Sequence, residues 1–239
     1  MSKPTGEINE QATSEDFEFA ALQEAVNYRR SLLAEFSPHL RGKILEVGAG
    51  IGQITRELAT LPNIESIDAL EPDSRFYDKL LKQGINGRCI CGTVADLEPV
   101  PIYDGIVCVN VLEHIDDHLD ELKKMKQRLK QGGKLCLFVP ACPSIYAPID
   151  RSFGHYRRYT SSELRGLLEK TGFQVNQLCY YNSLGFFAWW MNFCVLKKTV
   201  FEVGKVKFYD KYLFPLVHAL ESRLMRPPFG QSLLAVAEA

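Results

Sequence analysis

The sequence lacks an excess of charge of either sign, a long apolar run and a regular spacing of cysteines. Its 239 residues carry a formal net charge of −1, which gives no reason to expect nucleic acid as a partner. The seven cysteines are scattered, and their odd number argues against a secreted disulfide framework. The most apolar stretch, residues 184–196, is 13 residues long and too short to span a bilayer as a helix.

The N-terminus lacks the apolar segment of a signal peptide, and the rest of the chain lacks internal repeats and Gly/Ser linkers. We therefore expect a cytoplasmic protein, with residues 1–15 as a disordered tail. A chain of 239 residues that is 46% hydrophobic can bury a sizeable core. Residues 16–239 are accordingly predicted to form a single domain.

Short β-branched runs alternate with amphipathic stretches from residue 43 onward. Strands that are apolar on both faces and alternate with helices are typical of a parallel sheet covered on both sides. The predicted strands are residues 43–50, 66–73, 88–97, 104–112, 134–141, 173–181 and 231–239. The predicted helices are residues 17–36, 53–61, 74–83, 117–130 and 160–172, and a long insertion separates the last two strands at residues 183–230.

A glycine-rich stretch, EVGAGIG, follows the first predicted strand at residues 46–52. Its glycines permit positive φ and let the backbone approach a ligand closely. Glu71 ends the second predicted strand, where a carboxylate can accept both hydroxyl protons of an adenosine ribose. Gln53 replaces the third glycine of the dinucleotide fingerprint, and Glu46 would repel a pyrophosphate. The loop therefore favours adenosine attached to a cationic group over adenosine attached to phosphate.

The motifs ILEVGAGIGQ, LEPD, GTVADLE and VCVNVLEHI resemble, in this order, those of class I S-adenosylmethionine-dependent methyltransferases, and SLLAVAE matches the final strand. The resemblance implies an α/β, Rossmann-like fold with seven strands, a mostly parallel sheet whose last strand is antiparallel, and helices on both faces. It implies S-adenosyl-L-methionine as the cofactor. The residues expected to bind it are Glu46, Gly48, Ala49 and Gly50 at the methionine moiety, Glu71 and Pro72 at the ribose, Asp96 and Leu97 at the adenine, Asn110 and Val111 beneath the sulfonium, and Tyr28 as a lid.

The stretch FGHYRRYT, residues 153–160, concentrates donors and aromatic rings directly after the fifth predicted strand, which places it over the ligand crevice. His155 is a candidate base for a hydroxyl proton. The stretch resembles a GHYRRY signature of bacterial methyltransferases encoded near sugar- and lipid-modifying enzymes. A surface loop pinned by tyrosine–backbone hydrogen bonds is the structural alternative. The residues expected to bind the acceptor are Tyr156, Arg157, Arg158 and Tyr159.

Two histidines lie four residues apart with acids between them, at residues 113–118. The zinc motif needs a glutamate directly after the first histidine, where Ile115 stands. Asp116 has the character of a helix N-cap, which would leave His114 outside the helix that carries His118. No metal is expected here, and His114 is a second candidate base or a packing residue at the pocket border.

The insertion at residues 183–230 is rich in aromatic rings and lysine. It is expected to act as a helical lid over the pocket, and an apolar, basic face for a membrane surface or for a dimer partner stays open beside that. The chain as a whole is predicted to transfer a methyl group to a heteroatom, in the first place oxygen, of a small or lipid-linked metabolite. The alternatives are an NAD(P)-dependent Rossmann oxidoreductase and a non-catalytic binding protein on the same fold.

Overall fold

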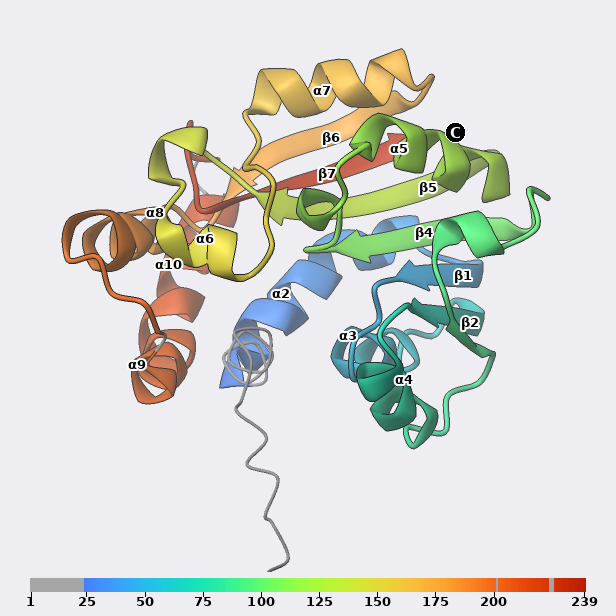
Figure 1. Cartoon of the computed structure of the whole chain (residues 1–239), viewed down its shortest axis with the longest axis horizontal. Coiled ribbons are helices and arrows are strands. Elements are labelled where there is room, and N and C mark those ends of the chain that lie inside the picture. Colours follow the sequence, from blue (N-terminus) through green and yellow to red (C-terminus); the bar gives the residue numbers. More distant parts are fainter. Residues whose placement is uncertain (1–23, 201, 224–225) are drawn as a thin grey trace, which may run out of the picture.

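The computed structural model describes residues 24–200, 202–223 and 226–239, so the expected tail at residues 1–15 lies outside the described part. The described residues form one sheet with the strand order β3-β2-β1-β4-β5-β7-β6 (Figure 1). Strand β7 pairs antiparallel with β5 and β6, and the other pairs are parallel. The expected fold class is confirmed. The strands are β1 Gly42–Val47, β2 Ile64–Glu71, β3 Cys89–Cys91, β4 Tyr103–Val109, β5 Leu129–Pro140, β6 Gln174–Tyr181 and β7 Ser232–Glu238.

Helices lie on both faces of the sheet and at the end where the parallel strands finish (Figure 1). Within residues 24–200, 202–223 and 226–239, every helix is too short or too polar to cross a bilayer. The helices are α2 Val26–Phe36, α3 Gln53–Leu58, α4 Ser74–Leu81, α5 His118–Arg128, α6 Pro148–Ser152, α7 Ser161–Lys170, α8 Ser183–Trp189, α9 Val203–Phe208 and α10 Phe214–Arg223. The π-helical segments Trp190–Val195 and Tyr209–Leu213 continue α8 and α9.

The central strands bury both of their faces because neighbouring residues point to opposite sides. Ile106 and Leu135 belong to one core cluster, together with residues of α5 and α7. Val107 and Cys136, the next residues along each strand, belong to a second cluster with residues of α2. The apolar runs read from the sequence are therefore core strands.

Helix α5 and strand β3 are shorter than the sequence-based expectation. Helix α5 ends at Arg128, before the glycine pair, because β5 already begins at Leu129 and pairs there with Tyr103 of β4. Its N-cap is Asp117, one residue later than expected, whose carboxylate accepts a hydrogen bond from the Asp120 N–H at 2.9 Å. Strand β3 has only three residues, since the chain then turns into the 3₁₀ helix Val94–Asp96.

The insertion folds back onto the N-terminal helix. Asp210, which is 4% exposed, accepts hydrogen bonds from the backbone N–H groups of Asn27 at 2.9 Å and Tyr28 at 2.8 Å. These N–H groups lie at the start of α2, where a helix has no carbonyl partners of its own. The insertion thus caps α2, and α8, α9 and α10 lie at the end of the sheet toward which β4 and β5 point (Figure 1).

Candidate functional site

The glycine loop leaves β1 in a tight turn against the neighbouring strands. The N–H groups of Gly48 and Ala49 donate to the carbonyl of Leu70 at 2.9 and 3.0 Å. Gly48 has a φ of +72°, and a Cβ there would lie 2.3 Å from Cγ2 of Val111. Only glycine fits this conformation and this close approach. The loop therefore forms a backbone cradle between the ends of β1, β2 and β4.

Glu71, at the end of β2, holds the loop from the other side. One carboxylate oxygen accepts a hydrogen bond from the Gly50 N–H at 2.8 Å, and the other accepts one from the Asp73 N–H at 2.9 Å. An ionised acceptor makes such bonds stronger than a neutral one would. Glu71 thus fixes the shape of the cradle and also lines the cavity in front of it.

Glu46 is the second acid of the loop, and it is only 3% exposed. Burial raises the pKa of this carboxyl to about 8, with a further contribution from the charge of Glu71, while Thr55 acts in the opposite direction. A cation bound beside Glu46 would favour its ionised form. This end of the cradle is therefore suited to a positively charged group.

A cavity of about 580 Å³ lies in front of the loop and is called the donor cavity below. Its wall contains most of the residues expected to bind the cofactor: Tyr28, Glu46, Gly48, Ala49, Glu71, Pro72, Asn110 and Val111. Gly50 supports the wall through its bond to Glu71 without lining it. The cavity size, the glycine cradle and the two acids fit an adenosine nucleoside with a cationic side chain.

Asp96 and Leu97, expected at the adenine, do not lie on this wall. The Asp96 carboxylate accepts hydrogen bonds from the N–H and the hydroxyl of Thr93 at 2.7 and 2.8 Å and closes a capping box. Leu97 packs against the main core instead. The wall is formed by the preceding residues 92–95 of the same turn, and a contact of Asp96 and Leu97 with the adenine stays a prediction.

Most side chains of the FGHYRRYT stretch, residues 153–160, bond to other groups of the protein. Arg158, 5% exposed, donates from Nε to Asp150 at 2.9 Å and from Nη1 to the Ala141 carbonyl at 3.1 Å. Its guanidinium also stacks over the Trp189 ring at 4.3 Å. His155 shares Asp150, with Nδ1 at 3.2 Å from the carboxylate. Burial raises the pKa of Asp150, but the bonds from His155 and Arg158 outweigh it and hold that pKa below its usual value.

Three of the residues expected to contact the acceptor are placed elsewhere. Tyr159 is 2% exposed, and its hydroxyl is 2.9 Å from Nδ1 of His118 and donates to the Leu112 carbonyl at 3.2 Å. Arg157 donates to the carbonyl of Ile115 at 2.8 Å. Tyr156 lies on the surface, 57% exposed. The loop is thus pinned by backbone bonds, as the structural alternative predicts, while His155 and Arg158 face a cavity.

That second cavity has a volume of about 450 Å³ and is called the acceptor cavity. The insertion supplies much of its apolar wall, including Trp189, Phe193 and Phe208. Tyr28 and Asn110 line both cavities, so the two spaces meet at the end of β4. Asn110 has a φ of +52°, the left-handed region that asparagine tolerates better than most residues.

A sequence model of the family described as "Methyltransferase domain" matches residues 20–178. The chain belongs to this family. The expectation of a class I methyltransferase that uses S-adenosylmethionine is confirmed, which argues against the oxidoreductase alternative. Among solved structures, a putative methyltransferase from Bacillus halodurans aligns with a TM-score of 0.60 at 17% identity, over 88% of this chain and 97% of that one. An S-adenosylmethionine-dependent methyltransferase from Mesorhizobium loti aligns with a TM-score of 0.61 at 14% identity, over 90% and 98%.

Curated relatives match a shorter region. The ubiquinone biosynthesis O-methyltransferase of Rickettsia canadensis is 24% identical over 151 residues, which is 57% of this chain and 64% of that protein. The protein of the same name from Rickettsia prowazekii is 30% identical over 153 residues, or 57% and 60%. The chain thus spans less than two thirds of the length of these relatives.

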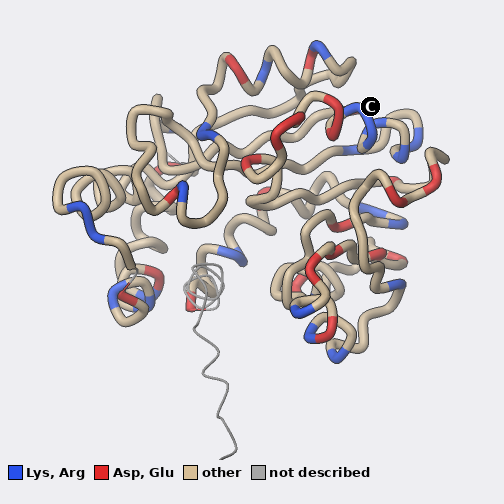
Figure 2. The backbone as a smooth tube through the Cα atoms, in the orientation of Figure 1, with Lys and Arg blue, Asp and Glu red and all other residues tan. Residues whose placement is uncertain are grey.

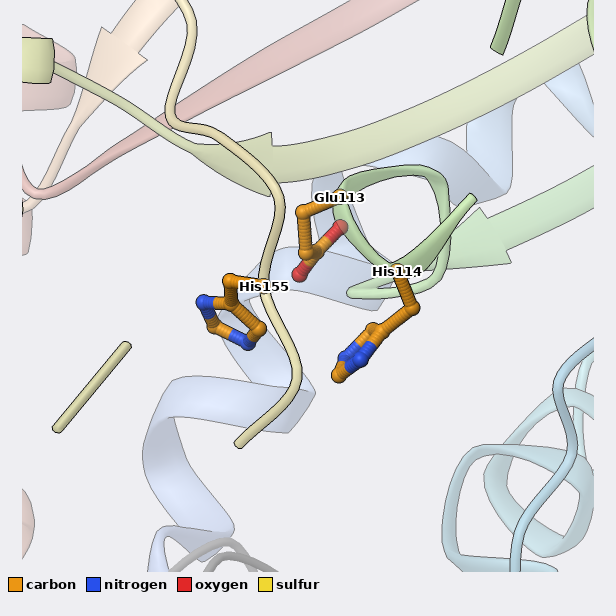
Figure 3. A group of neighbouring side chains, drawn as sticks. All are labelled: Glu113, His114 and His155. Atoms are coloured by element: carbon orange, nitrogen blue, oxygen red, sulfur yellow. The ribbon is translucent and has the colours of Figure 1, made fainter. Parts of the chain in front are cut away.

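In this methyltransferase, one cluster at the junction of the cavities was missed by sequence reasoning. Glu113, His114 and His155 each offer a ligand atom, and these atoms lie within 4.8 Å of one another (Figure 3). Glu113 is completely buried, and the two imidazole rings meet edge to face with centroids 4.6 Å apart. Burial and the neighbouring His155 lower the pKa of His114 to about 4. The three residues come from two segments about 40 positions apart, so no local spacing could reveal them.

Proposed function

We propose that this methyltransferase transfers the methyl group to a hydroxyl oxygen of a small amphiphilic acceptor, whose apolar part lies in the acceptor cavity. The observation that carries the proposal is the meeting of the two cavities at Tyr28 and Asn110. A nucleophile held in one cavity can approach a methyl group presented from the other at that single point. Methyl transfer needs such an in-line approach more than it needs a covalent intermediate.

Bound S-adenosylmethionine supplies an electrophilic methyl group. The protein's own residues then have to align the hydroxyl and keep water out. Tyr28 is well suited to exclude water, because its ring packs against Phe138 and Phe214 with centroids 6.0 and 5.0 Å away. An acceptor oxygen that bonds to the methyl carbon would break the carbon–sulfur bond, so S-adenosylhomocysteine would be the leaving group. The hydroxyl would lose its proton beside the cluster of Glu113, His114 and His155.

The names of the curated relatives support oxygen as the methylated atom, because both Rickettsia proteins are O-methyltransferases.

An apolar extension of the acceptor is supported by the insertion. Of the 15 exposed large hydrophobic residues in the described part of the chain, 11 lie at residues 187–220, and three of these, Val200, Phe208 and Leu213, line the acceptor cavity. Such a concentration is unusual for a surface that meets only water. Figure 2 shows acidic and basic residues interspersed along the described chain as a whole.

The acceptor class can be tested with matched pairs of hydroxylated compounds. Simple phenols and aliphatic alcohols would be compared with the same head groups carrying a ten-carbon chain, and transfer of radiolabelled methyl would be measured. The proposal predicts O-methyl products and a lower KM for the chain-bearing member of a pair. Methylation of amines alone, or an equal KM within every pair, would contradict it.

A further inference from the structure

We propose that Glu113, His114 and His155 bind a divalent transition-metal ion at the junction of the donor and acceptor cavities. Two imidazoles and one carboxylate are a donor set that suits Mn²⁺, Fe²⁺, Co²⁺ or Zn²⁺ better than Mg²⁺, which prefers oxygen ligands. Three protein ligands leave further coordination positions open for water or substrate.

The distances are compatible with one ion. Ligand atoms about 2.1 Å from a tetrahedral ion are about 3.4 Å from one another. The three candidate atoms lie within 4.8 Å of one another, so each pair has to approach by at most about 1.4 Å to bind one ion. Figure 3 shows the side chains converging from two backbone segments, the turn after β4 and the loop that follows α6.

The support behind His155 is the second, independent observation. Asp150, completely buried, lies 3.2 Å from Nδ1 of His155 and is itself held by Arg158 and by the Ala147 N–H at 2.8 Å. A carboxylate on one ring nitrogen fixes the tautomer that presents the other nitrogen as a ligand, which is the usual arrangement behind a metal-bound histidine. Because Nδ1 faces Asp150, Nε2 is the ring nitrogen that would act as the metal ligand.

The loop is also tied to Glu113 through the backbone. The Tyr156 N–H donates to the Glu113 carbonyl at 2.8 Å, so the residue after His155 is bonded to the residue before His114. The hydroxyl of Tyr146 donates to the His155 carbonyl at 2.7 Å. Both segments therefore hold the ligands in a fixed relation, as a metal site requires.

The catalytic consequence rests on the proposed function. Glu113 and His155 line the acceptor cavity and His114 lines the donor cavity, so the ion would lie beside the acceptor hydroxyl. A hydroxyl bound to such an ion loses its proton to solvent near neutral pH and becomes a better nucleophile. Neither histidine then has to act as the base.

The test is metal binding by the full chain, stripped with a chelator and titrated with Co²⁺ in the absence of donor and acceptor. Visible absorption should report one Co²⁺ per chain with nitrogen and oxygen ligands, and Zn²⁺ should displace it. The variants His155→Ala and His114→Ala should each weaken binding at least about 100-fold, and Asp150→Asn about 10- to 100-fold. The matched control is His39→Ala, which removes a histidine just before β1, at the end of the sheet where the parallel strands begin and the cluster does not lie.

Circular dichroism and the urea-denaturation midpoint of each variant show whether it is folded, because His114 lines the donor cavity and its loss can change S-adenosylhomocysteine binding directly. The inference is overturned if the wild type binds no Co²⁺, if the spectrum shows thiolate ligation, or if His155→Ala binds as tightly as His39→Ala. Those results would leave the proposed methyl transfer standing. A chain that binds Co²⁺ as expected but methylates no hydroxyl would overturn the proposed function instead.

Discussion

Glu46 offers the most direct test of the donor cavity. Its carboxyl is buried, and its pKa of about 8 means that at pH 7 it is mostly protonated before any ligand binds. The α-ammonium group that S-adenosylmethionine and S-adenosylhomocysteine share would favour the carboxylate. Ligand binding should therefore release a proton from Glu46.

The sign and size of the pH dependence follow from that pKa. Below about pH 8 the carboxyl has to lose its proton before it can pair with the ammonium group, so affinity rises with pH. Between pH 6.5 and 8.0 the ionised fraction of such a group increases from about 3% to about 50%. The affinity for S-adenosylhomocysteine should increase about 15-fold over that interval and level off above it.

Titration calorimetry in two buffers with different ionisation enthalpies measures the released proton directly. The wild type should release close to one proton more at pH 7 than the Glu46→Gln variant, and the variant should lack the rise in affinity. The comparison cancels any titration of the ligand's own amino group. Equal proton release by the two proteins would refute the reasoning.

The ligand-free protein gives a second readout of the same carboxyl. The unfolded chain ionises freely above its usual pKa of 4.5, whereas the folded protein does so only near pH 8. The wild type therefore loses stability as pH rises between these values, relative to Glu46→Gln. At pH 7 the variant should be more stable by about 3 kcal/mol in urea denaturation, and the two should coincide near pH 4.5.

Three further substitutions test separate parts of the structure. Glu71→Gln should weaken S-adenosylhomocysteine binding about tenfold in calorimetry, because the Gly50 N–H loses an anionic acceptor. Asp68→Ala should lower the free energy of unfolding in urea by on the order of 2–3 kcal/mol, because the Asp68 carboxylate is 2% exposed and pairs with the largely exposed Arg88 at 2.6 Å. An unchanged denaturation midpoint would contradict this. Trp189→Ala should raise the KM for the acceptor while the affinity for S-adenosylhomocysteine stays constant, because the ring lines only the acceptor cavity; a loss of both would show that the cavities are not separate.

The donor half of the site was predictable because its signals are local. The glycine loop, the strand before it and Glu71 lie within 30 residues, and parallel topology alone brings the ends of β1 and β2 together. The capping box at Asp96 is local too, but the sequence analysis did not anticipate it. Its bond to Thr93 uses the same carboxylate that is expected at the adenine.

The acceptor half of the site could not be predicted from local sequence signals, because it depends largely on contacts between distant segments. The partner of His155 is Asp150, only five residues away, but nothing in the spacing distinguishes that acid from any other in a loop. Trp189 stacks on Arg158 across 31 residues, and Asp210 caps α2 from the far end of the chain. The composition of the insertion indicated a cover for the pocket and gave no information about which rings would face it.

The buried Asp150–Arg158 pair explains why a stretch so rich in polar groups lies inside the protein. A buried ion pair adds little net stability, because desolvation offsets most of the attraction between the charges. Here the pair fixes an acid that holds His155 by one ring nitrogen, and Arg158 in turn supports Trp189 on the cavity wall. One network thus sets the position of a histidine at the junction and of an aromatic ring in the acceptor cavity. Loss of either charge should disturb both at once, which links the chemistry at the junction to the shape of the space where the acceptor binds.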